Sequence, residues 1–396
     1  MSERVILFLC TLLLYAIAPV KAQNYINPVG KKFPVVAWYS VEPGYITRSE
    51  YKMMSKAGFT LSLSSFLSKE ETIKALSVAK GTGVKLIVDC QDARNAATPF
   101  INNVKNSKAL GLYYLSDEPS SDYFQNLQEK VQRIKINDNS HYPYINLLPL
   151  YASSEQTNTS SYKDYLERYI EMMEPDYISY DHYPFVRDEY RLDFFDNLDI
   201  VSKVCKKHNI VFWGFVRSLY DSNYTKIDEG RIRFQVFSQL AYGAQAIQYF
   251  TYSSPRGCGY AIVDSLHNKT PLYDIVSAIN HEIQGYSKFF LNSNVLSIVH
   301  SDKQGQEGNK ISNVISHLDS NGVGVLLSLF EKKGKYYLIV VNKDYENSQE
   351  VTIEFNKKAK VISQKGRAKT SSYHRFVLEA GNGMLFHLKI KDLYAN

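Results

Sequence analysis

The sequence has few cysteines and no motif typical of a metal or nucleotide site. Only four of its 396 residues are cysteine, and the three beyond the N-terminal region, Cys90, Cys205 and Cys258, show no C-x-x-C spacing. They allow at most one disulfide bond and argue against a cysteine-ligated metal ion. No glycine-rich turn follows a strand-like run, which argues against an open nucleotide-binding sheet. The sequence therefore predicts neither a cofactor nor a bound metal.

Charge of one sign is not concentrated anywhere, and long apolar runs are almost absent. The net charge of +6 is spread without a block of like charges, so we expect no nucleic-acid partner. The one long apolar run, Val5 to Val20, spans about 16 residues, whereas a membrane-spanning helix needs roughly 20. Small side chains at Val20 and Ala22 fit a cleavage site. We therefore expect residues 1–22 to be a signal peptide, with export to the periplasm or the exterior and no membrane span afterwards; the oligomeric state stays open.

From residue 33 onward, short apolar runs alternate with longer helix-like segments. This alternation is typical of βα units around a parallel sheet. The strand-like runs are residues 34–39, 60–65, 85–89, 110–118, 144–148, 177–181, 211–216 and 246–251. Crossovers of about 20 to 35 residues separate them, which fits a closed barrel better than an open sheet. We predict an α/β fold, with a (β/α)₈ TIM barrel over residues 33–292.

The pattern changes near residue 294, beyond which we find only short strand-like runs. These are residues 295–300, 324–330, 335–342, 350–355, 359–363, 373–378 and 383–388. The turn at residues 330–335 joins two of them as a hairpin, with Gly334 in the left-handed position. This predicts a small antiparallel β-sandwich domain over residues 294–396, packed directly on the barrel because no linker separates the two.

Polar and aromatic residues gather at the carboxyl ends of the predicted barrel strands, where such barrels build their active sites. These candidates are Trp38, Asp89, Asp117, Glu118, Asn146, Asp181, His182, Tyr183, Trp213, Arg217, Tyr249 and Tyr252. Cleavage of a glycosidic bond needs this kind of set, because one carboxyl protonates the leaving oxygen while a second group stabilises a cationic sugar ring.

The strongest local signal is the fourth strand, which ends in Asp117, Glu118 and Pro119. Two consecutive strand residues normally point to opposite sides, so two acids at a buried barrel mouth are costly without a task. The alternative is that one acid caps the next helix and the other pairs with a base. If both face the mouth, the charge of Asp117 should raise the pKa of Glu118, as a general acid requires.

The Asp117-Glu118-Pro119 motif resembles the Asn-Glu-Pro of clan A glycoside hydrolases, and the barrel with a following sandwich resembles family 42 β-galactosidases. The resemblance covers roughly residues 34–290 and implies that Glu118 is the catalytic acid/base. That clan carries its nucleophilic glutamate at the end of strand seven. This chain has no acid there; the nearest are Asp221 and Glu229, and Glu229 is typical of the first turn of a helix.

Two other groups could replace the missing nucleophile. Asp181, at the end of strand six, could activate a water or attack the sugar, according to its distance from Glu118. Alternatively, the Asp-Glu pair resembles that of family 123 and family 20 hexosaminidases. That resemblance implies that Asp117 orients an acetamido group of the substrate, so that no protein nucleophile is needed. The sequence leaves both possibilities open.

The remaining candidates are expected to bind the carbohydrate substrate. Stacking on sugar faces is expected of Trp38, Trp213, Tyr249 and Tyr252. Asn146 and His182 are expected to bind hydroxyl groups and Arg217 to neutralise charge, while Asp89 and Tyr183 complete the set. The sequence thus predicts an exported glycoside hydrolase acting on a poly- or oligosaccharide. The alternative is a non-catalytic carbohydrate-binding protein on a degenerate barrel, which the missing acid of strand seven favours.

Overall fold

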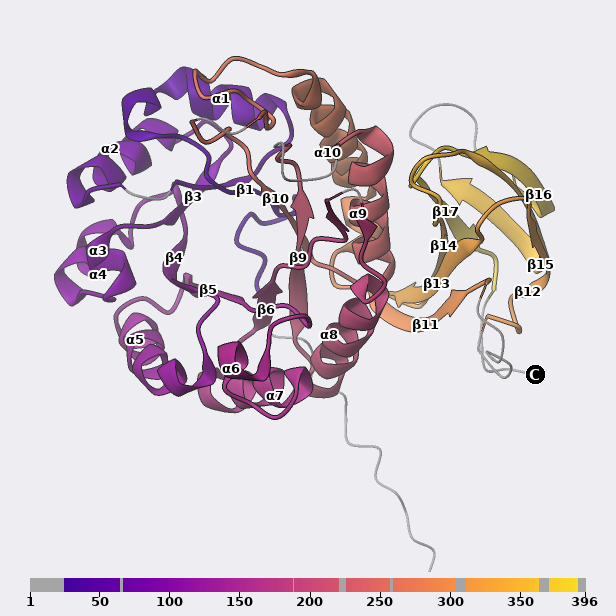
Figure 1. Cartoon of the computed structure of the whole chain (residues 1–396), viewed down its shortest axis with the longest axis horizontal. Helices are drawn as coiled ribbons and strands as arrows, with labels where there is room; N and C mark the ends of the chain where they lie inside the picture. The colour runs from indigo at the N-terminus through magenta and orange to yellow at the C-terminus, as the bar shows by residue number, and fades with distance from the viewer. Residues whose placement is uncertain are drawn as a thin grey trace, which may run out of the picture.

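A computed structural model describes residues 25–64, 67–187, 189–220, 226–256, 259–302, 311–362 and 370–390. The predicted signal peptide and Cys258 lie outside these ranges. The described chain forms a closed barrel of eight parallel strands, followed by a separate antiparallel sheet (Figure 1). The predicted fold class is therefore confirmed. None of the described helices is both long and apolar enough to cross a bilayer.

The barrel strands lie where the apolar runs predict them. They are β1 (Val35–Ala37), β2 (Leu61–Leu63), β3 (Lys85–Val88), β4 (Leu110–Asp117), β5 (Tyr142–Leu147), β6 (Tyr177–Tyr180), β9 (Val211–Arg217) and β10 (Ala246–Phe250). They follow one another around the ring in chain order, and β10 pairs with β1 to close it. Strands of such a barrel are covered on both faces, which explains their nearly continuous apolar sequences.

Helices surround the barrel on the outside (Figure 1). They are α1 (Arg48–Lys56), α2 (Lys69–Ala79), α3 (Gln91–Arg94), α4 (Thr98–Val104), α5 (Phe124–Asn137), α6 (Ser154–Thr157), α7 (Tyr162–Met173), α8 (Phe194–His208), α9 (Glu229–Ala241) and α10 (Pro271–Phe290). Several start at a side-chain cap: Ser68 and Glu71 form a capping box at α2, and Asp228 accepts a hydrogen bond from the backbone of Arg231 at α9.

Aromatic side chains fill the barrel interior, so it is a packed core rather than a channel. They include Tyr25, Trp38, Tyr114, Tyr144, Tyr177, Trp213 and Phe215. Tyr177 and Trp213 stack with their ring centroids 4.5 Å apart. Large rings bury much apolar surface at little cost in side-chain entropy. Packing thus accounts for many of the 31 tyrosines of the sequence.

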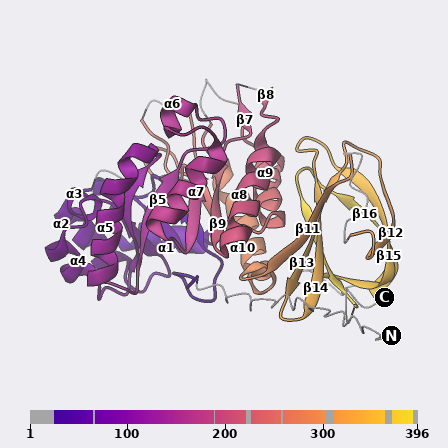
Figure 2. The ribbon, with the colours of Figure 1, turned by 90° about the horizontal axis from the view of Figure 1, so that it is seen from below.

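The C-terminal strands form one continuous sheet that folds over into two layers (Figure 2). The strands are β11 (Asn294–His300), β12 (Ile315–Ser320), β13 (Val325–Lys332), β14 (Lys335–Asn342), β15 (Gln349–Ile362), β16 (Thr370–Leu378) and β17 (Gly383–Leu388). The sequence patterns miss β12, which is mostly exposed and polar. They also divide β15, whose register shifts between Glu354 and Ala359 while it pairs with strands of both layers. Gly334 has a positive φ in the β13–β14 turn, as predicted.

The two-layered sheet packs on α9 and α10 through an extensive apolar face (Figures 1 and 2). Leu326 and Ile339 belong to the core shared with the barrel, whereas their neighbours Leu327 and Leu338 belong to the core of the sheet domain. Successive strand residues alternate between faces, so β13 and β14 are buried on both sides. Their nearly continuous apolar sequences are explained by this double burial.

Two glycines allow the domains to approach closely. Gly381 has a φ of +64°, and a Cβ atom there would overlap the carbonyl oxygen of Gly230 and lie 2.5 Å from the backbone nitrogen of Phe234. Gly230 in turn has no room for a side chain, because Tyr345 and Ala380 lie against it. The sheet domain is therefore docked at backbone contact distance.

We predict that Gly381→Ala lowers the free energy of unfolding by roughly 2–4 kcal/mol, because it combines backbone strain with a clash between domains. Gly334→Ala is the matched control: its φ is +72°, but nothing lies within 4 Å of its added Cβ. It should cost only about 1 kcal/mol. Urea unfolding of both variants measures the difference, and equal losses would contradict the close docking.

Candidate active site

A bulge in β4 turns both acids of the Asp-Glu pair toward the barrel mouth. Tyr114 faces the interior opposite Tyr144, but the register then slips, so that Leu115 and Ser116 both face outward. Asp117 consequently pairs with Asn146 and points inward, one residue later than regular alternation would allow. The bulge thus explains how two neighbouring acids can both face the mouth, although consecutive strand residues normally point to opposite sides.

Glu118 leaves the strand in the left-handed region, with φ at +46°. A residue with a Cβ adopts this conformation at a cost of about 1 kcal/mol or more, and such strain concentrates at functional sites. Its backbone N–H donates to the carbonyl oxygen of Asn146 at 2.8 Å, which fixes the turn. The side chains of Asp117 and Glu118 are both solvent-exposed. The two acids therefore remain accessible at the carboxyl end of the barrel.

Asn146 joins the acids of two strands. Its Nδ2 group donates to Asp117 Oδ1 at 3.0 Å and to Asp181 Oδ1 at 2.8 Å. Its Oδ1 accepts a hydrogen bond from the Ser179 hydroxyl at 2.9 Å. Because Ser179 fixes the amide orientation, both N–H groups must face the carboxyl groups. Asn146, predicted to bind substrate, is thus engaged in positioning the acids.

A buried polar network supports Asn146 from below. Gln248 donates to Ser179 Oγ at 2.9 Å, Tyr144 donates to Gln248 Oε1 at 2.5 Å, and Trp38 Nε1 donates to Tyr144 Oη at 3.2 Å. These residues come from the strands β5, β6 and β10 and, for Trp38, from the position directly after β1. Buried polar groups that satisfy one another in this way hold a single arrangement. Trp38 is 2 % exposed, so its ring takes part in this network and has no free face on which a sugar could stack.

Asp181 lies behind Glu118 and shares a hydrogen bond with it. Asp181 is 8 % exposed, and burial together with the nearby charges of Glu118 and Asp117 raises its pKa well above the ordinary range. The two side chains are joined by a hydrogen bond, which requires a proton between the two carboxyl groups. The pKa of Glu118 is also raised, first by desolvation and then by the charge of Asp117. The two carboxyl groups form a pair with one shared proton.

The contact between Glu118 and Asp181 has a mechanistic consequence. A covalent mechanism places two carboxyl groups about 5 Å apart, and an inverting one places them about 6.5–9.5 Å apart. The hydrogen bond between the two groups places them side by side in this structure. In this arrangement Asp181 is positioned to share a proton with Glu118.

A salt bridge closes the side of the site next to β3. Asp89 is 1 % exposed and accepts two hydrogen bonds from Arg94, at 2.6 and 3.0 Å. The Arg94 guanidinium also lies 5.1 Å from the centroid of the Tyr114 ring. The positive charge of Arg94 partly offsets the rise that burial produces in the pKa of Asp117. Asp89 thus holds Arg94 in place beside the site. The sequence patterns did not identify Arg94.

The segment after β6 supplies the opposite side. Tyr151, 39 % exposed, carries the Arg191 guanidinium on its face at 3.8 Å and has the His182 ring at 5.1 Å. His182 is buried, and its Nε2 faces Asp193 Oδ1 at 3.1 Å. Burial lowers the pKa of His182. Tyr183 is half-buried, with Phe250 at 5.6 Å, and it remains at the mouth.

Several predicted sugar-binding residues do not reach the mouth. Trp213 fills the barrel interior, and Tyr249 and Tyr252 face outward against Phe59; all three are fully buried. Their predicted stacking role does not fit this arrangement, because all three rings are packed inside hydrophobic cores and have no exposed surface. Arg217 is 4 % exposed and donates from Nε to the Leu219 carbonyl, so it stabilises the chain directly after β9.

The seventh barrel strand, β9, supplies no carboxylate among the described residues. Glu229 forms an ion pair with Arg233 in the first turn of α9, at 2.8 Å, as its sequence context predicts. Asp221 lies outside the described ranges. In the described part of the chain, His, Cys, Asp and Glu side chains form no group of three or more that could hold a metal ion.

Sequence reasoning missed Arg94, Tyr151, Arg191 and Gln248. Two signals were present: Gln248 is a polar residue inside the apolar run of β10, and Arg94 follows Asp89 at the spacing of roughly one helical turn. Tyr151 and Arg191 come from loops, whose course a single sequence does not specify.

Comparison with known proteins identifies the fold. No family model and no curated protein sequence matches the chain. The structure is similar to a GH42 β-galactosidase from G. stearothermophilus, with a TM-score of 0.52 and 8% identity over 90% of this chain and 98% of that one. A proposed α-galactosidase from Bacteroides fragilis gives a TM-score of 0.52 and 7% identity over 92% of this chain and 81% of that one.

A third similar structure is a β-galactosidase from psychrophilic Marinomonas ef1, with a TM-score of 0.46 and 9% identity; the match covers 64% of this chain and 60% of that one. At such identities the likeness concerns the fold alone. For the fold, the resemblance to clan A glycoside hydrolases that the sequence predicts is confirmed by the two structures with the higher scores.

We predict that Asp181→Asn stabilises the protein at neutral pH by roughly 1–3 kcal/mol. Asparagine can still accept from Asn146 and donate to Glu118, but it carries no charge. Because the native pKa of Asp181 is raised, the wild type loses stability as pH rises from about 4 through that pKa, whereas the variant does not. Thermal unfolding between about pH 4 and pH 8 should show a gap that widens with pH.

Asp193→Asn is the control of opposite sign. The hydrogen bond with His182 lowers the pKa of Asp193, so the wild type should be the more stable protein at neutral pH. That advantage should disappear as pH falls through the native pKa of Asp193. A gap for Asp181→Asn that stays constant or shrinks as pH rises would show that the buried carboxyl does not hold a proton.

Proposed function

We propose that this protein is an exported glycoside hydrolase in which Glu118 is the proton donor. The observation that carries the proposal is an exposed glutamate at a barrel mouth, hydrogen-bonded to a buried Asp181 whose pKa is raised. The fold is the one found in the glycosidases to which the structure is similar. Export is supported by the apolar run and cleavage site of residues 1–22.

The shared proton suits general acid catalysis. Glu118 faces the substrate side, and Asp181 lies behind it in a buried position. When Glu118 gives its proton to the leaving oxygen, the pair becomes doubly negative, which is unfavourable in a desolvated site. The pair therefore regains a proton readily, in step with the deprotonation of a water in the second half of the reaction.

Asp117 is the remaining carboxylate that can face the sugar. It lies beside Glu118, it is exposed, and Asn146 fixes its orientation. Asp181 is in contact with Glu118, and we therefore assign the second role to Asp117. We propose that Asp117 accepts a hydrogen bond from the N–H of a 2-acetamido group, whose carbonyl oxygen attacks the anomeric carbon as the bond to the leaving oxygen breaks. Such substrate assistance needs no protein nucleophile.

Replacing the proton donor tests the proposal directly. Glu118→Gln should lower kcat on aryl glycosides and on oligosaccharides by at least about 10²-fold, because the amide cannot protonate the leaving oxygen. Released reducing ends are measured over a broad substrate panel. Glu129→Gln, which removes an exposed acid of α5, is the control and should keep wild-type activity.

Folding of the Glu118→Gln variant is verified by thermal unfolding and ligand binding by calorimetry. An active variant would refute the catalytic role of Glu118. Sugar binding by the wild type without any product would instead support the non-catalytic carbohydrate-binding alternative.

The substrate class is tested separately. Aryl 2-acetamido-2-deoxyhexosides should be hydrolysed at least about 100-fold faster than the matching aryl hexosides, and Asp117→Asn should remove this preference. Equal rates on the two kinds of substrate would exclude substrate assistance while leaving the role of Glu118 intact.

A further inference from the structure

The segment between β6 and α8 carries much of one side of the site. It begins with Asp181 and Tyr183 and ends with Arg191 and Asp193. Between them lies a small hairpin of β7 (Phe185–Val186) and β8 (Glu189–Tyr190), which the sequence patterns did not predict. Strands of two residues do not form a stable hairpin in water without packing against a neighbour. The position of the site residues thus depends on what covers this hairpin.

A tyrosine of the C-terminal domain covers it. Tyr345 comes from the loop between β14 and β15, and its ring centroid lies 4.7 Å from that of Phe185 and 5.8 Å from that of Tyr190. Phe234 of α9 completes the cluster, at 5.9 Å from both hairpin rings. Aromatic groups at these distances attract one another beyond the effect of their buried area. Both paired strands of the hairpin are therefore anchored to the other domain.

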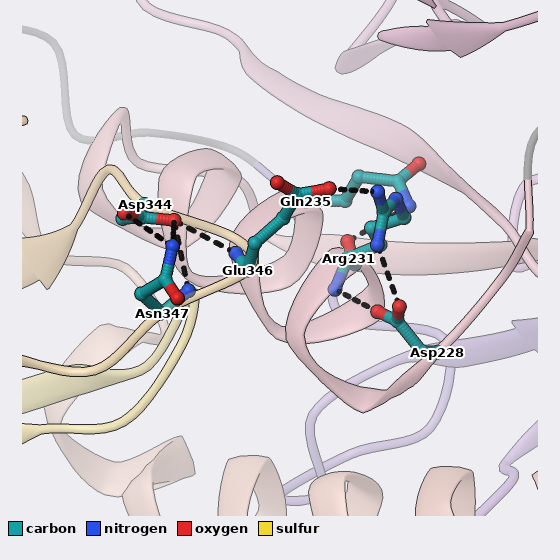
Figure 3. Close-up of polar contacts among 6 residues, drawn as sticks. All are labelled: Asp228, Arg231, Gln235, Asp344, Glu346 and Asn347. Atoms are coloured by element: carbon teal, nitrogen blue, oxygen red, sulfur yellow. Dashed lines mark hydrogen bonds and ion pairs between the residues drawn. The ribbon is translucent and has the colours of Figure 1, made fainter. Parts of the chain in front are cut away.

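The loop that carries Tyr345 is itself firmly held (Figure 3). The Asp344 carboxylate accepts hydrogen bonds from the backbone N–H groups of Glu346 and Asn347, both at 2.9 Å. Arg231 of α9 bridges Glu346 at 2.5 Å and Asp228 at 2.6 Å. An internally bonded loop tied to a helix of the barrel cannot shift independently of it.

Arg231 also links this loop to the rings and to the barrel. Its guanidinium lies 5.1 Å from the ring centroid of Tyr345 and 5.7 Å from that of Phe185. Its backbone carbonyl accepts from Gln235, whose Oε1 accepts the backbone N–H of Arg217 at 2.8 Å (Figure 3 shows Gln235 beside Arg231). One helix thus connects the C-terminal loop, the hairpin and the end of β9.

We propose that the C-terminal domain is a structural part of the catalytic centre, with Tyr345 as a positioning residue that holds the 181–193 segment in its active conformation. This role rests on the proposed hydrolase function for its effect on turnover. The structural effect on the segment does not depend on that function. The domain is therefore a support for the active site and not an independent module tethered to it.

Amide hydrogen exchange tests the structural part without any substrate. In Tyr345→Ala, exchange of the Arg191 amide, which donates to the Pro184 carbonyl at 2.7 Å, should accelerate at least about tenfold, while the strands β13 and β14 keep their wild-type protection. Tyr345→Phe keeps the ring and should behave as the wild type. Tyr373→Ala is the matched control, because Tyr373 lies on β16 of the same domain and is 45 % exposed. Unchanged exchange in a folded Tyr345→Ala variant would overturn the proposal.

If Tyr345→Ala does not fold, Tyr345→Leu provides the test, because it keeps most of the apolar volume but loses the ring contacts. Accelerated exchange confined to the hairpin segment, with Arg191 as the reporter, supports the proposal. Exchange equal to the wild type in this variant, with its aromatic contacts removed, overturns it.

Turnover provides the second readout, on whichever aryl glycoside the wild type hydrolyses. Tyr345→Ala should lower kcat by at least about tenfold and change KM by less than about threefold, since displacement of catalytic groups acts mainly on the transition state. Tyr345→Phe should restore kcat. A kcat unchanged despite accelerated exchange would overturn the catalytic link. A wild type without any activity would refute the hydrolase function and leave the exchange result to decide the positioning role.

Discussion

The extra residue in β4 is the constraint on which the site depends. Regular alternation after Tyr114 would turn Asp117 outward into the apolar layer between barrel and helices, where a carboxylate cannot be accommodated. The bulge at Leu115 and Ser116 shifts the alternation by one residue, and the positive φ of Glu118 then keeps the next side chain at the same mouth. Two neighbouring acids can face one ligand only because the strand is irregular at this point.

Three carboxyl groups that lie close together repel one another when they are ionised. Hydrogen bonds from the barrel interior reduce this repulsion. Asn146 donates to Asp117 and Asp181, and Ser179, Gln248 and Tyr144 keep that amide from rotating. Burial, and then the repulsion that remains between the neighbouring acids, raises the pKa of Asp181 and of Glu118. The same features that make the site costly to fold therefore raise the pKa of the carboxyl groups that could act as a general acid.

The barrel and the principal acid could be predicted from the sequence, because buried parallel strands read as apolar runs and an acid at a strand end stands out against them. Glu118 and Asp181 are two acids that the sequence placed correctly at strand ends. The orientation of Trp213, Tyr249 and Tyr252 could not be predicted, since a run of apolar residues gives no sign of which face is inner and which is outer. The positions of Arg191 and Tyr345 are set by loops and by contacts between domains, which local sequence patterns do not specify.

The absent acid of β9 and the contact between Glu118 and Asp181 are two aspects of one arrangement. In a barrel with opposed carboxylates, each acid is kept apart from the other by the substrate between them. In this barrel Asp181 lies behind Glu118 and affects its pKa. Tyr151, Tyr183 and Arg191 line the far side of the mouth. Those groups can bind and orient a sugar but cannot form a stable glycosyl ester as a carboxylate does. Under the proposed function, the chemistry of the second group comes from Asp117 or from the substrate. The support of the 181–193 segment by both domains then matters for orienting the sugar and not for nucleophilic attack.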